Sequence, residues 1–463
     1  MLTRPAGSRT SEETILDIHC IEPAKCDDNT ATAKSRKYAW IVFALTFGLL
    51  LSDYMSRQVL NAVFPLLKQA WGLSDTQLGS LSGVVALMVG LLTFPLSVLA
   101  DRWGRVRSLV LMATLWSLAT LGCAIATNYG EMLVARACVG LGEAAYGSVG
   151  IALILSIFPA HLRSTLTGAF MAGGAFGSVL GMALGGFVAM HFGWRASFAA
   201  MAIFGIVLVI VYRLTVSDKR IAARYGDAQP ATRQADGIRT SLRALLAGLF
   251  STVSVVCAYV GSGLQLFIMG AVIAWMPSFL NRYYAMPADK AAAGAAVFVL
   301  LGGIGMVACG VVTDKICRNA PSRKWITALA YCLISIVLLS IGFRVAPGAL
   351  QLVLLGAGIL VVAGTSGPAG AMVANLTPST IHASAFATLT LANNLLGLAP
   401  GPLVTGAIAD RIGLLGALQV IPLVGVAAMV AFALGRARYA RDLDKIDALR
   451  GRASEQQATE ISR

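Results

Sequence analysis

The sequence has few charged residues, since Asp, Glu, Lys and Arg make up only 13% of its 463 positions. A soluble protein carries about a quarter charged residues, because its surface must face water. Hydrophobic residues make up 57% of the chain, and they occur in runs long enough to cross about 30 Å of hydrocarbon as helices. A helix pairs its own backbone polar groups inside lipid. The composition therefore excludes a soluble globular protein and predicts an all-α membrane protein.

Cysteine clusters with metal-ligand spacing are also missing, because the eight cysteines show no such pattern. Most lie in apolar runs, where a free thiol acts as a small hydrophobic group. The sequence contains no recognisable nucleophile–base pair and no nucleotide-binding domain. Residues 140–145 fit a G-x-G-x-x-A dinucleotide motif, but they lie inside an apolar run with no preceding strand. We therefore expect no cofactor, no metal, no enzyme activity and no direct use of ATP.

The net charge of +14 is concentrated in alternate loops. These loops share an excess of basic residues, namely Lys34, Arg36, Lys37, Arg102, Arg105, Arg107, Lys219, Arg220, Arg224, Lys315, Arg318, Arg323, Lys324, Arg436, Arg438 and Arg441. The positive-inside rule places such loops, and with them both termini, in the cytoplasm. The charge therefore does not predict nucleic-acid binding. Residues 1–34 lack an apolar core, so we expect no cleavable signal peptide.

Apolar periodicity predicts twelve spans, at about 38–63, 76–100, 107–127, 131–157, 163–190, 195–215, 252–280, 290–313, 324–343, 348–374, 382–409 and 414–436. The long polar stretch between the sixth and seventh spans divides the chain into two pseudo-symmetric six-helix bundles. The expected organisation is a tail at 1–37, a bundle at 38–215, a linker at 216–251, a second bundle at 252–437 and a tail at 438–463. We expect the last tail to be disordered or loosely helical.

A short charged phrase occurs twice, at residues 97–105 and, 213 positions later, at residues 310–318. Each copy closes the second span of one half. Charged side chains at a helix end can form and break contacts with a neighbouring helix. We therefore predict a conformational switch built from the charged residues of both copies, Asp101, Arg102, Arg105, Asp314, Lys315 and Arg318.

Ionisable residues inside a span are costly in lipid and are usually functional. Span 1 carries Asp53 and Arg57 one turn apart, and span 4 carries Arg136 and Glu143 on one helix face. Counting helical rise from the span ends puts Asp53 and Arg136 at similar depths, with Glu143 near the midplane. We therefore expect Asp53 to pair with Arg136. We predict that Glu143, Asp53 and Arg136 couple proton movement to a conformational change, although a permanent ion pair would explain the same residues.

Polar side chains within the spans are candidates for substrate contact, and the strongest are Arg57, Tyr146, Tyr259, Gln265 and Asn393. An interhelical hydrogen bond is the alternative for each neutral residue in this set. Span 5 also carries glycines at every fourth position, Gly173, Gly177, Gly181 and Gly185. Such a smooth face serves either static helix packing or gating.

Several of these motifs resemble those of the major facilitator superfamily. The loop at residues 101–105 matches the family's signature loop, although Ser97 and Cys317 depart from the motif in the two copies. Arg136 with Gly140 resembles the span-4 motif, and the span-5 glycines resemble the family's glycine-rich motif. The resemblance covers residues 35–437, and it implies two bundles that rock about a central cavity.

A finer resemblance is to the Spinster-like branch and to organic anion:proton symporters. It is carried by RQVL at 57–60, GLSDTQLG at 72–79 and GLGEAAY at 140–146. The branch links its span-4 arginine and glutamate to proton coupling, which implies this role for Arg136 and Glu143. In span 1 the usual Asp-Arg pair is replaced by Ser56-Arg57, and Asp53 stands one turn earlier.

These observations predict a monomeric secondary transporter of the inner (plasma) membrane. It is expected to work as a proton symporter for a small organic anion or an amphipathic solute. Its partners are then the solute, protons and the lipid bilayer. A proton-driven drug or lipid efflux pump is one alternative, and a non-coupled facilitator or sensor is another.

Overall fold

A computed structural model describes residues 28–159, 162–225, 249–250, 252–318, 320, 322–377 and 382–461. The described chain is almost entirely helical, with eleven helical segments long and apolar enough to cross a membrane. The last segment, Ser384–Asp444, contains two spans, because Gly413 (φ 78°) interrupts the helix there. The described residues therefore form the twelve expected spans.

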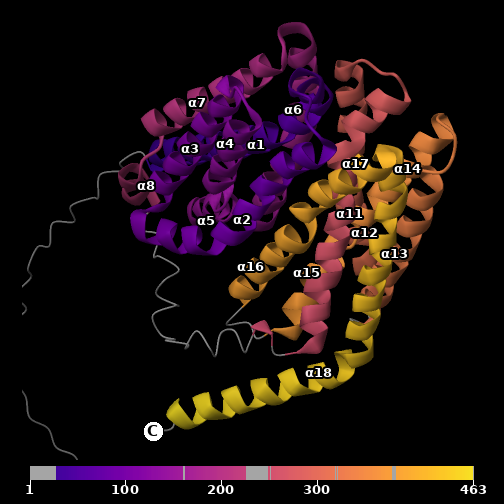
Figure 1. The fold of residues 1–463 in the computed structure, drawn as a ribbon. Helices are drawn as coiled ribbons and strands as arrows, with labels where there is room; N and C mark the ends of the chain where they lie inside the picture. The colour runs from indigo at the N-terminus through magenta and orange to yellow at the C-terminus, as the bar shows by residue number, and fades with distance from the viewer. Residues whose placement is uncertain are drawn as a thin grey trace, which may run out of the picture.

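The two bundles are the indigo-to-magenta and the rose-to-yellow groups of helices in Figure 1. The first consists of α1 (Asp28–Trp71), α2 (Asp75–Trp103), α3 (Arg105–Ile125), α4 (Tyr129–Glu143), α5 (Tyr146–Ile157), α6 (Arg163–Phe192) and α7 (Trp194–Thr215). The short helix α8 (Asp218–Tyr225) follows it. The second consists of α11 (Val253–Tyr283), α12 (Ala288–Cys317), α13 (Arg323–Gly342), α14 (Ala349–Ala363), α15 (Ser366–Leu376), α16 (His382–Ala392), η3 (Asn393–Leu398), α17 (Pro400–Val420), η4 (Ile421–Leu423) and α18 (Val424–Ile461).

The segments outside the spans differ in part from expectation. The tail expected to be disordered or loosely helical is instead helical as far as Ile461, as the continuation of α18. Figure 1 shows this last part of α18 turning away from the axis of the bundle. Residues 1–27 of the N-terminal tail and residues 226–248 of the linker lie outside the described ranges.

Spans 4 and 10 are each interrupted near the middle, at corresponding places in the two bundles. Span 4 is divided between α4 and α5, and span 10 between α14 and α15. The second interruption follows from Pro368, because a proline cannot donate to the carbonyl four residues earlier and its ring clashes there. At the first, the hydroxyl of Thr93 donates to the carbonyl of Ala144 at 2.8 Å. The carbonyl of Ala144, beside the interruption, thus receives its hydrogen bond from a side chain of α2.

Span 11 contains a π-helical segment, η3, directly before Pro400. The N–H of Ala399 donates to the carbonyl of Asn394 at 2.9 Å, five residues back instead of four. Proline disfavours the regular α-helical pattern over the preceding turn, and a π-bulge absorbs the misfit. The π segment thus accommodates Pro400 within span 11.

The two ends of the molecule pack differently. We call the end of the molecule at which α3 begins and α7 ends the basic end. The other end of the molecule is called the opposite end. Towards the opposite end one apolar cluster joins both bundles, and it includes Phe64 and Trp275, whose ring centroids lie 5.3 Å apart. Towards the basic end each bundle has its own cluster, one around Trp116 and the other around Trp325. Among the described residues, the apolar cluster that joins the two bundles therefore lies towards the opposite end.

Close helix contact at the shared core depends on glycines of α2. A Cβ placed at Gly79 would overlap the carbonyl of Pro402, and one at Gly83 would overlap that of Ala399. Both glycines belong to the first bundle, whereas both carbonyls belong to α17 and the turn before it. The backbones of the two bundles thus approach along α2, and a side chain at either glycine would separate them.

Candidate functional site

The centre of the first bundle contains a buried ion pair. Nε and Nη2 of Arg57 on α1 donate to Oε2 of Glu143 at 3.0 and 2.6 Å. Glu143 is the last residue of α4 and lies midway between the ends of its span. Its side chain is fully buried, whereas that of Arg57 is 21% exposed. The arginine therefore connects a buried carboxylate to a more open region.

Asp53 lies beside this pair, one turn before Arg57 on α1. Its carboxyl group interacts electrostatically with those two side chains. Oδ1 of Asp53 and Oε1 of Glu143 are both buried, and neither receives a hydrogen bond within the described residues. A carboxylate can only accept, whereas a protonated carboxyl group also donates. One proton shared by the two carboxyl groups would therefore supply the missing donor.

The expected pairing of Asp53 with Arg136 is wrong. Arg136 is fully buried, and its guanidinium donates to the backbone carbonyls of Ser56 at 3.0 Å, Arg57 at 3.4 Å and Leu81 at 3.4 Å. It forms no ion pair with a described carboxylate. Arg136 thus joins α4 to α1 and α2 and fixes the backbone from which Arg57 projects.

Two glycines bring α4 close enough for these contacts. A Cβ at Gly140 would lie 2.7 Å from the carbonyl oxygen of Val85 on α2. A Cβ at Gly142 would lie 2.6 Å from the backbone nitrogen of Trp116 on α3. Such distances are too short for any other residue, so α4 packs against α2 and α3 through its own backbone. This packing positions Glu143 at the centre of the bundle.

Two of the residues predicted to contact substrate make contacts inside the bundles. The hydroxyl of Tyr146 donates to the carbonyl of Thr46 at 2.8 Å, and its ring packs edge-on against Trp116. The amide of Gln265 donates to Sγ of Cys332 at 2.9 Å. Both side chains are fully buried. These contacts match the alternative of an interhelical bond.

The remaining predicted substrate residues are placed differently. Tyr259 is buried beside Phe250, and its hydroxyl has no partner within the described residues. Asn393 lies in the π segment, where Oδ1 also lacks a donor from the described chain. Of the five predicted residues, Arg57 alone forms an ion pair with Glu143.

The first copy of the charged phrase is joined to neighbouring helices. Nη1 of Arg105 donates to the carbonyl of Ala152 on α5 at 3.3 Å, and the N–H of Val106 donates to Oδ1 of Asp218 at 3.2 Å. Asp218 opens α8, so this helix is attached to the start of α3. The side chain of Asp101 lies outside the described residues.

The other switch candidates point away from the helix packing. Four side chains are exposed, those of Arg102, Asp314, Lys315 and Arg318. None of the four forms a side-chain hydrogen bond or an ion pair with another described residue. The two copies therefore differ in their contacts, and their role in switching stays a prediction.

A second charged cluster, at the opposite end, is absent from the sequence-based candidates. We call it the Asp75 cluster. Both guanidinium nitrogens Nη1 and Nη2 of Arg282 donate to the carboxylate of Asp75 at 2.8 and 2.7 Å, and Nζ of Lys68 donates to it at 2.6 Å. Arg282 belongs to the second bundle and Asp75 to the first. The cluster therefore connects the two bundles.

Asp410 of α17 adds a further connection to the start of α2. Its carboxylate accepts from the N–H groups of Asp75 at 2.8 Å and Thr76 at 2.9 Å, and from the Thr76 hydroxyl at 2.6 Å. A carboxylate at a helix N-terminus pairs free N–H groups and interacts favourably with the helix dipole. The capping box of Ser74 and Gln77 is a signal in the sequence for this helix start. Nothing in the sequence marks Asp410 as its partner.

Twelve spans in two bundles, with interruptions at corresponding positions and a buried charged site, define a membrane transporter. The Major Facilitator Superfamily model matches residues 46–399, and the chain belongs to this family. The family and the fold expected from the sequence are thereby confirmed, as is the expectation of a transporter rather than an enzyme.

Two of the following three relatives are named for their solutes, and the third is a Spinster protein. The chain is 28% identical to the gallate transporter of Pseudomonas putida, over 66% of this chain and 71% of the relative. It is 24% identical to the hexuronate transporter of Bacillus subtilis, over 81% and 88%. It is 28% identical to protein spinster homolog 1 of Homo sapiens, over 52% and 46%.

A solved structure shows the same fold. It is that of a bacterial homolog to the human lysosomal transporter Spinster, in an inward-facing and unoccupied conformation. The TM-score is 0.76 at 18% identity, and the alignment covers 88% of this chain and 98% of the other.

Proposed function

We propose that the protein couples the movement of protons to that of a small organic anion, by alternating access. The observation that carries this proposal is the pair of buried, electrostatically interacting carboxyl groups of Asp53 and Glu143. Each has a buried oxygen without a donor in the described chain, and Arg57 reaches only Oε2 of Glu143. A buried acceptor without a donor is costly, so the arrangement favours binding of a proton between the two groups.

The charge of the site changes with its proton content. Arg57 and Arg136 together balance Asp53 and Glu143 when both carboxyl groups are ionised. Each proton bound adds one positive charge to this buried region, where electrostatic attraction is stronger than in water. A protonated site therefore favours an anionic solute, and release of the solute favours release of the proton. Arg57 is the contact for the solute, because its side chain is partly exposed.

The conformation fits one step of such a cycle. The basic loops assign the basic end to the cytoplasm of the inner membrane, with both termini on that side. Within the described parts of the bundles at 38–215 and 252–437, the apolar cluster and the ion pair that join the bundles lie towards the opposite end. This is the packing of an inward-open carrier. The interrupted spans 4 and 10 lie at corresponding places in the two repeats, where transporters commonly bind their solutes.

An organic anion is the first candidate for the solute. The names of two relatives specify gallate and hexuronate, which are both carboxylates at neutral pH. An amphipathic solute is the second candidate, favoured by the resemblance to Spinster proteins. Drug or lipid efflux and uncoupled transport are the competing functions. The chain is proposed to act as a monomer, with each bundle moving as a unit.

The test uses the purified full-length protein in liposomes that contain a pH-sensitive dye. Gradients of gallate, glucuronate and a lysophospholipid are applied separately. We expect a carboxylate gradient to move protons in the same direction with the wild type. Glu143→Gln should abolish proton movement and leave solute exchange.

Glu131→Gln is the matched control, because Glu131 is an exposed carboxylate on the same helix. Its proton movement should equal that of the wild type. The proposal of proton coupling is wrong if protons move as fast with the Glu143→Gln variant as with the Glu131→Gln control. The proposal that the solute is an organic anion is wrong if only the lysophospholipid gradient moves protons.

A further inference from the structure

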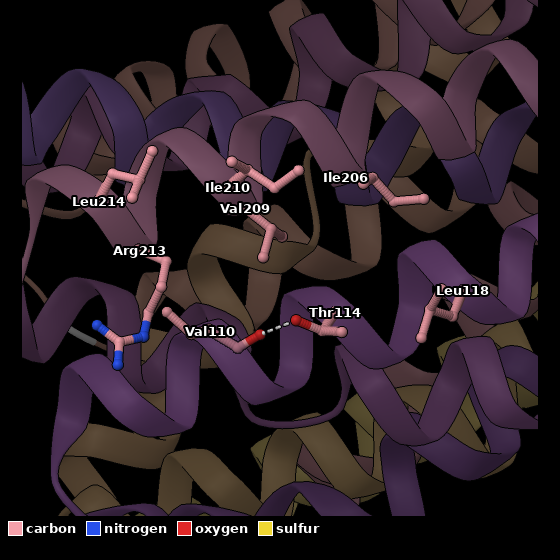
Figure 2. A pocket seen from close by; sticks show the side chains of 8 residues that line it. All are labelled: Val110, Thr114, Leu118, Ile206, Val209, Ile210, Arg213 and Leu214. Carbon is pink, nitrogen blue, oxygen red and sulfur yellow. Dashed lines mark hydrogen bonds between the residues drawn. The ribbon is translucent and has the colours of Figure 1, made fainter.

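A groove runs along the surface of the first bundle between α3 and α7, and Figure 2 shows the side chains that line it. Its volume is about 360 Å³, and its walls extend from Val110 to Leu118 on α3 and from Ile206 to Leu214 on α7. Six of the eight side chains are apolar, and three of these are exposed, namely Leu118 at 53%, Ile210 at 53% and Leu214 at 73%. Figure 1 shows both helices on the side of the first bundle that faces away from the second. The groove therefore faces lipid.

The groove occupies one leaflet of the membrane. Each wall covers eight residue steps, which is about 12 Å at 1.5 Å per residue. Half of the hydrocarbon core is about 15 Å thick. Since α3 begins at Arg105 and α7 ends at Thr215, the groove starts near the basic end and reaches towards the middle of the bilayer. Its length fits an acyl chain of the leaflet on that side.

The one charged side chain of the lining is at the end of the groove that lies nearest the basic end. Arg213 points from α7 towards α3 there (Figure 2). Its guanidinium has no hydrogen bond or ion pair within the described parts of the chain. The hydroxyl of Thr114, in contrast, donates to the carbonyl of Val110 at 2.7 Å. The arginine is thus the polar group of the lining that is free to bind a ligand.

A second arginine stands at the same end. Arg107 precedes Val110 by one turn, so helical spacing puts it on the face of α3 that forms the groove wall. It is exposed and, like Arg213, forms no ion pair with a described residue. Two guanidinium groups at one end of an apolar groove are complementary to a phosphate group that is attached to a hydrocarbon chain. Basic pockets between spans on the cytoplasmic side are known to bind anionic headgroups.

We propose that this groove is a binding site for one anionic phospholipid. Its phosphate is bound by Arg213, with Arg107 close to the headgroup, and one acyl chain lies between α3 and α7. The site is separate from Asp53, Arg57 and Glu143, so the proposal does not depend on proton coupling. The lipid holds α3 against α7, two helices that pack directly against each other.

The test is lipid retention by the full-length protein, measured by native mass spectrometry after delipidation in detergent. Phosphatidylglycerol and phosphatidylcholine are added back separately at equal concentration. The wild type should retain the anionic lipid in preference to the zwitterionic one. Arg213→Gln should lower phosphatidylglycerol retention by about fivefold, which corresponds to the loss of one basic side chain at an anionic lipid surface.

Two further variants make the result specific. Arg323→Gln removes an exposed arginine at the same end of the membrane, at the start of α13, and should retain the lipid like the wild type. Ile210→Trp fills the groove, keeps Arg213 and changes only an exposed side chain, so it should also weaken retention. The proposal is overturned if both lipids are retained equally, if Arg323→Gln lowers retention as much as Arg213→Gln, or if Ile210→Trp has no effect.

Discussion

At the scale of single residues, the sequence identifies the buried charges but not their partners. Asp53, Arg57 and Glu143 are marked by their position within apolar runs, and the structure brings them together. The predicted pairing of Arg136 with Asp53 was wrong, because helical rise gives the depth of a side chain in the membrane and not the direction in which it points. Arg136 lies two turns from Glu143 and reaches carbonyls of α1 and α2 instead.

Arg136→Lys tests the role of these carbonyl contacts. A lysine has a single charged group and cannot reach three separate carbonyls as the guanidinium does. The variant should lose about 1.5–3 kcal/mol of stability, the range for hydrogen bonds to a charged group. Thermal unfolding in detergent measures the change, with the exposed Arg102→Lys as control. Equal unfolding of both variants would contradict the role assigned to Arg136.

At the scale of helices, apolar runs predict all twelve spans, whereas the irregular segments are harder to foresee. Pro368 and Pro400 are visible causes for the interruption of span 10 and for the π segment. The interruption after Glu143 contains no proline, and no local signal marks it. The span-5 glycines favour static packing over gating, because a Cβ at Gly177 would lie 2.6 Å from the carbonyl of Leu51 in the same bundle.

The glycines of α2 are among those that meet the other bundle, which leads to a prediction for Gly83→Leu. A leucine there would overlap the carbonyl of Ala399 and push the bundles apart at the shared core. Hydrogen exchange should therefore increase in peptides that cover α2 and α17 near the opposite end. Gly147→Leu is the control, because a Cβ at Gly147 has no neighbour within 4 Å. Unchanged exchange in Gly83→Leu would show that this contact does not close the opposite end.

At the scale of the whole molecule, the charge pattern predicts orientation and duplication but not conformation. Two packings of one transporter differ by a small free energy, and no local pattern records which one is adopted. The asymmetry between the shared core and the two separate cores is visible only in three dimensions. The same holds for the Asp75 cluster, because Arg282 lies 207 positions from Asp75 in the sequence.

The Asp75 cluster should stabilise the closed opposite end. Arg282→Gln removes a bidentate partner from Asp75 and should increase opening at this end by roughly tenfold, within the usual range of coupling energies. Maleimide labelling of a cysteine introduced at Phe64 measures the opening, relative to the protein without that cysteine. Lys290→Gln, at an exposed site on the same end, is the control.

Asp75 and Arg282 should act as one unit in keeping the opposite end closed. Asp75→Asn combined with Arg282→Gln should therefore open the end no more than Asp75→Asn alone. Additive effects of the two substitutions, or labelling equal to that of Lys290→Gln, would contradict a role for this contact in closure.

Infrared difference spectroscopy detects a proton bound between Asp53 and Glu143. Spectra of the purified protein are recorded as the pH is stepped through the range of transport. The wild type should show a protonated-carboxyl band that Asp53→Asn and Glu143→Gln each remove and Glu131→Gln retains. A band that persists in both variants, or that is absent from the wild type at every pH, would contradict the account.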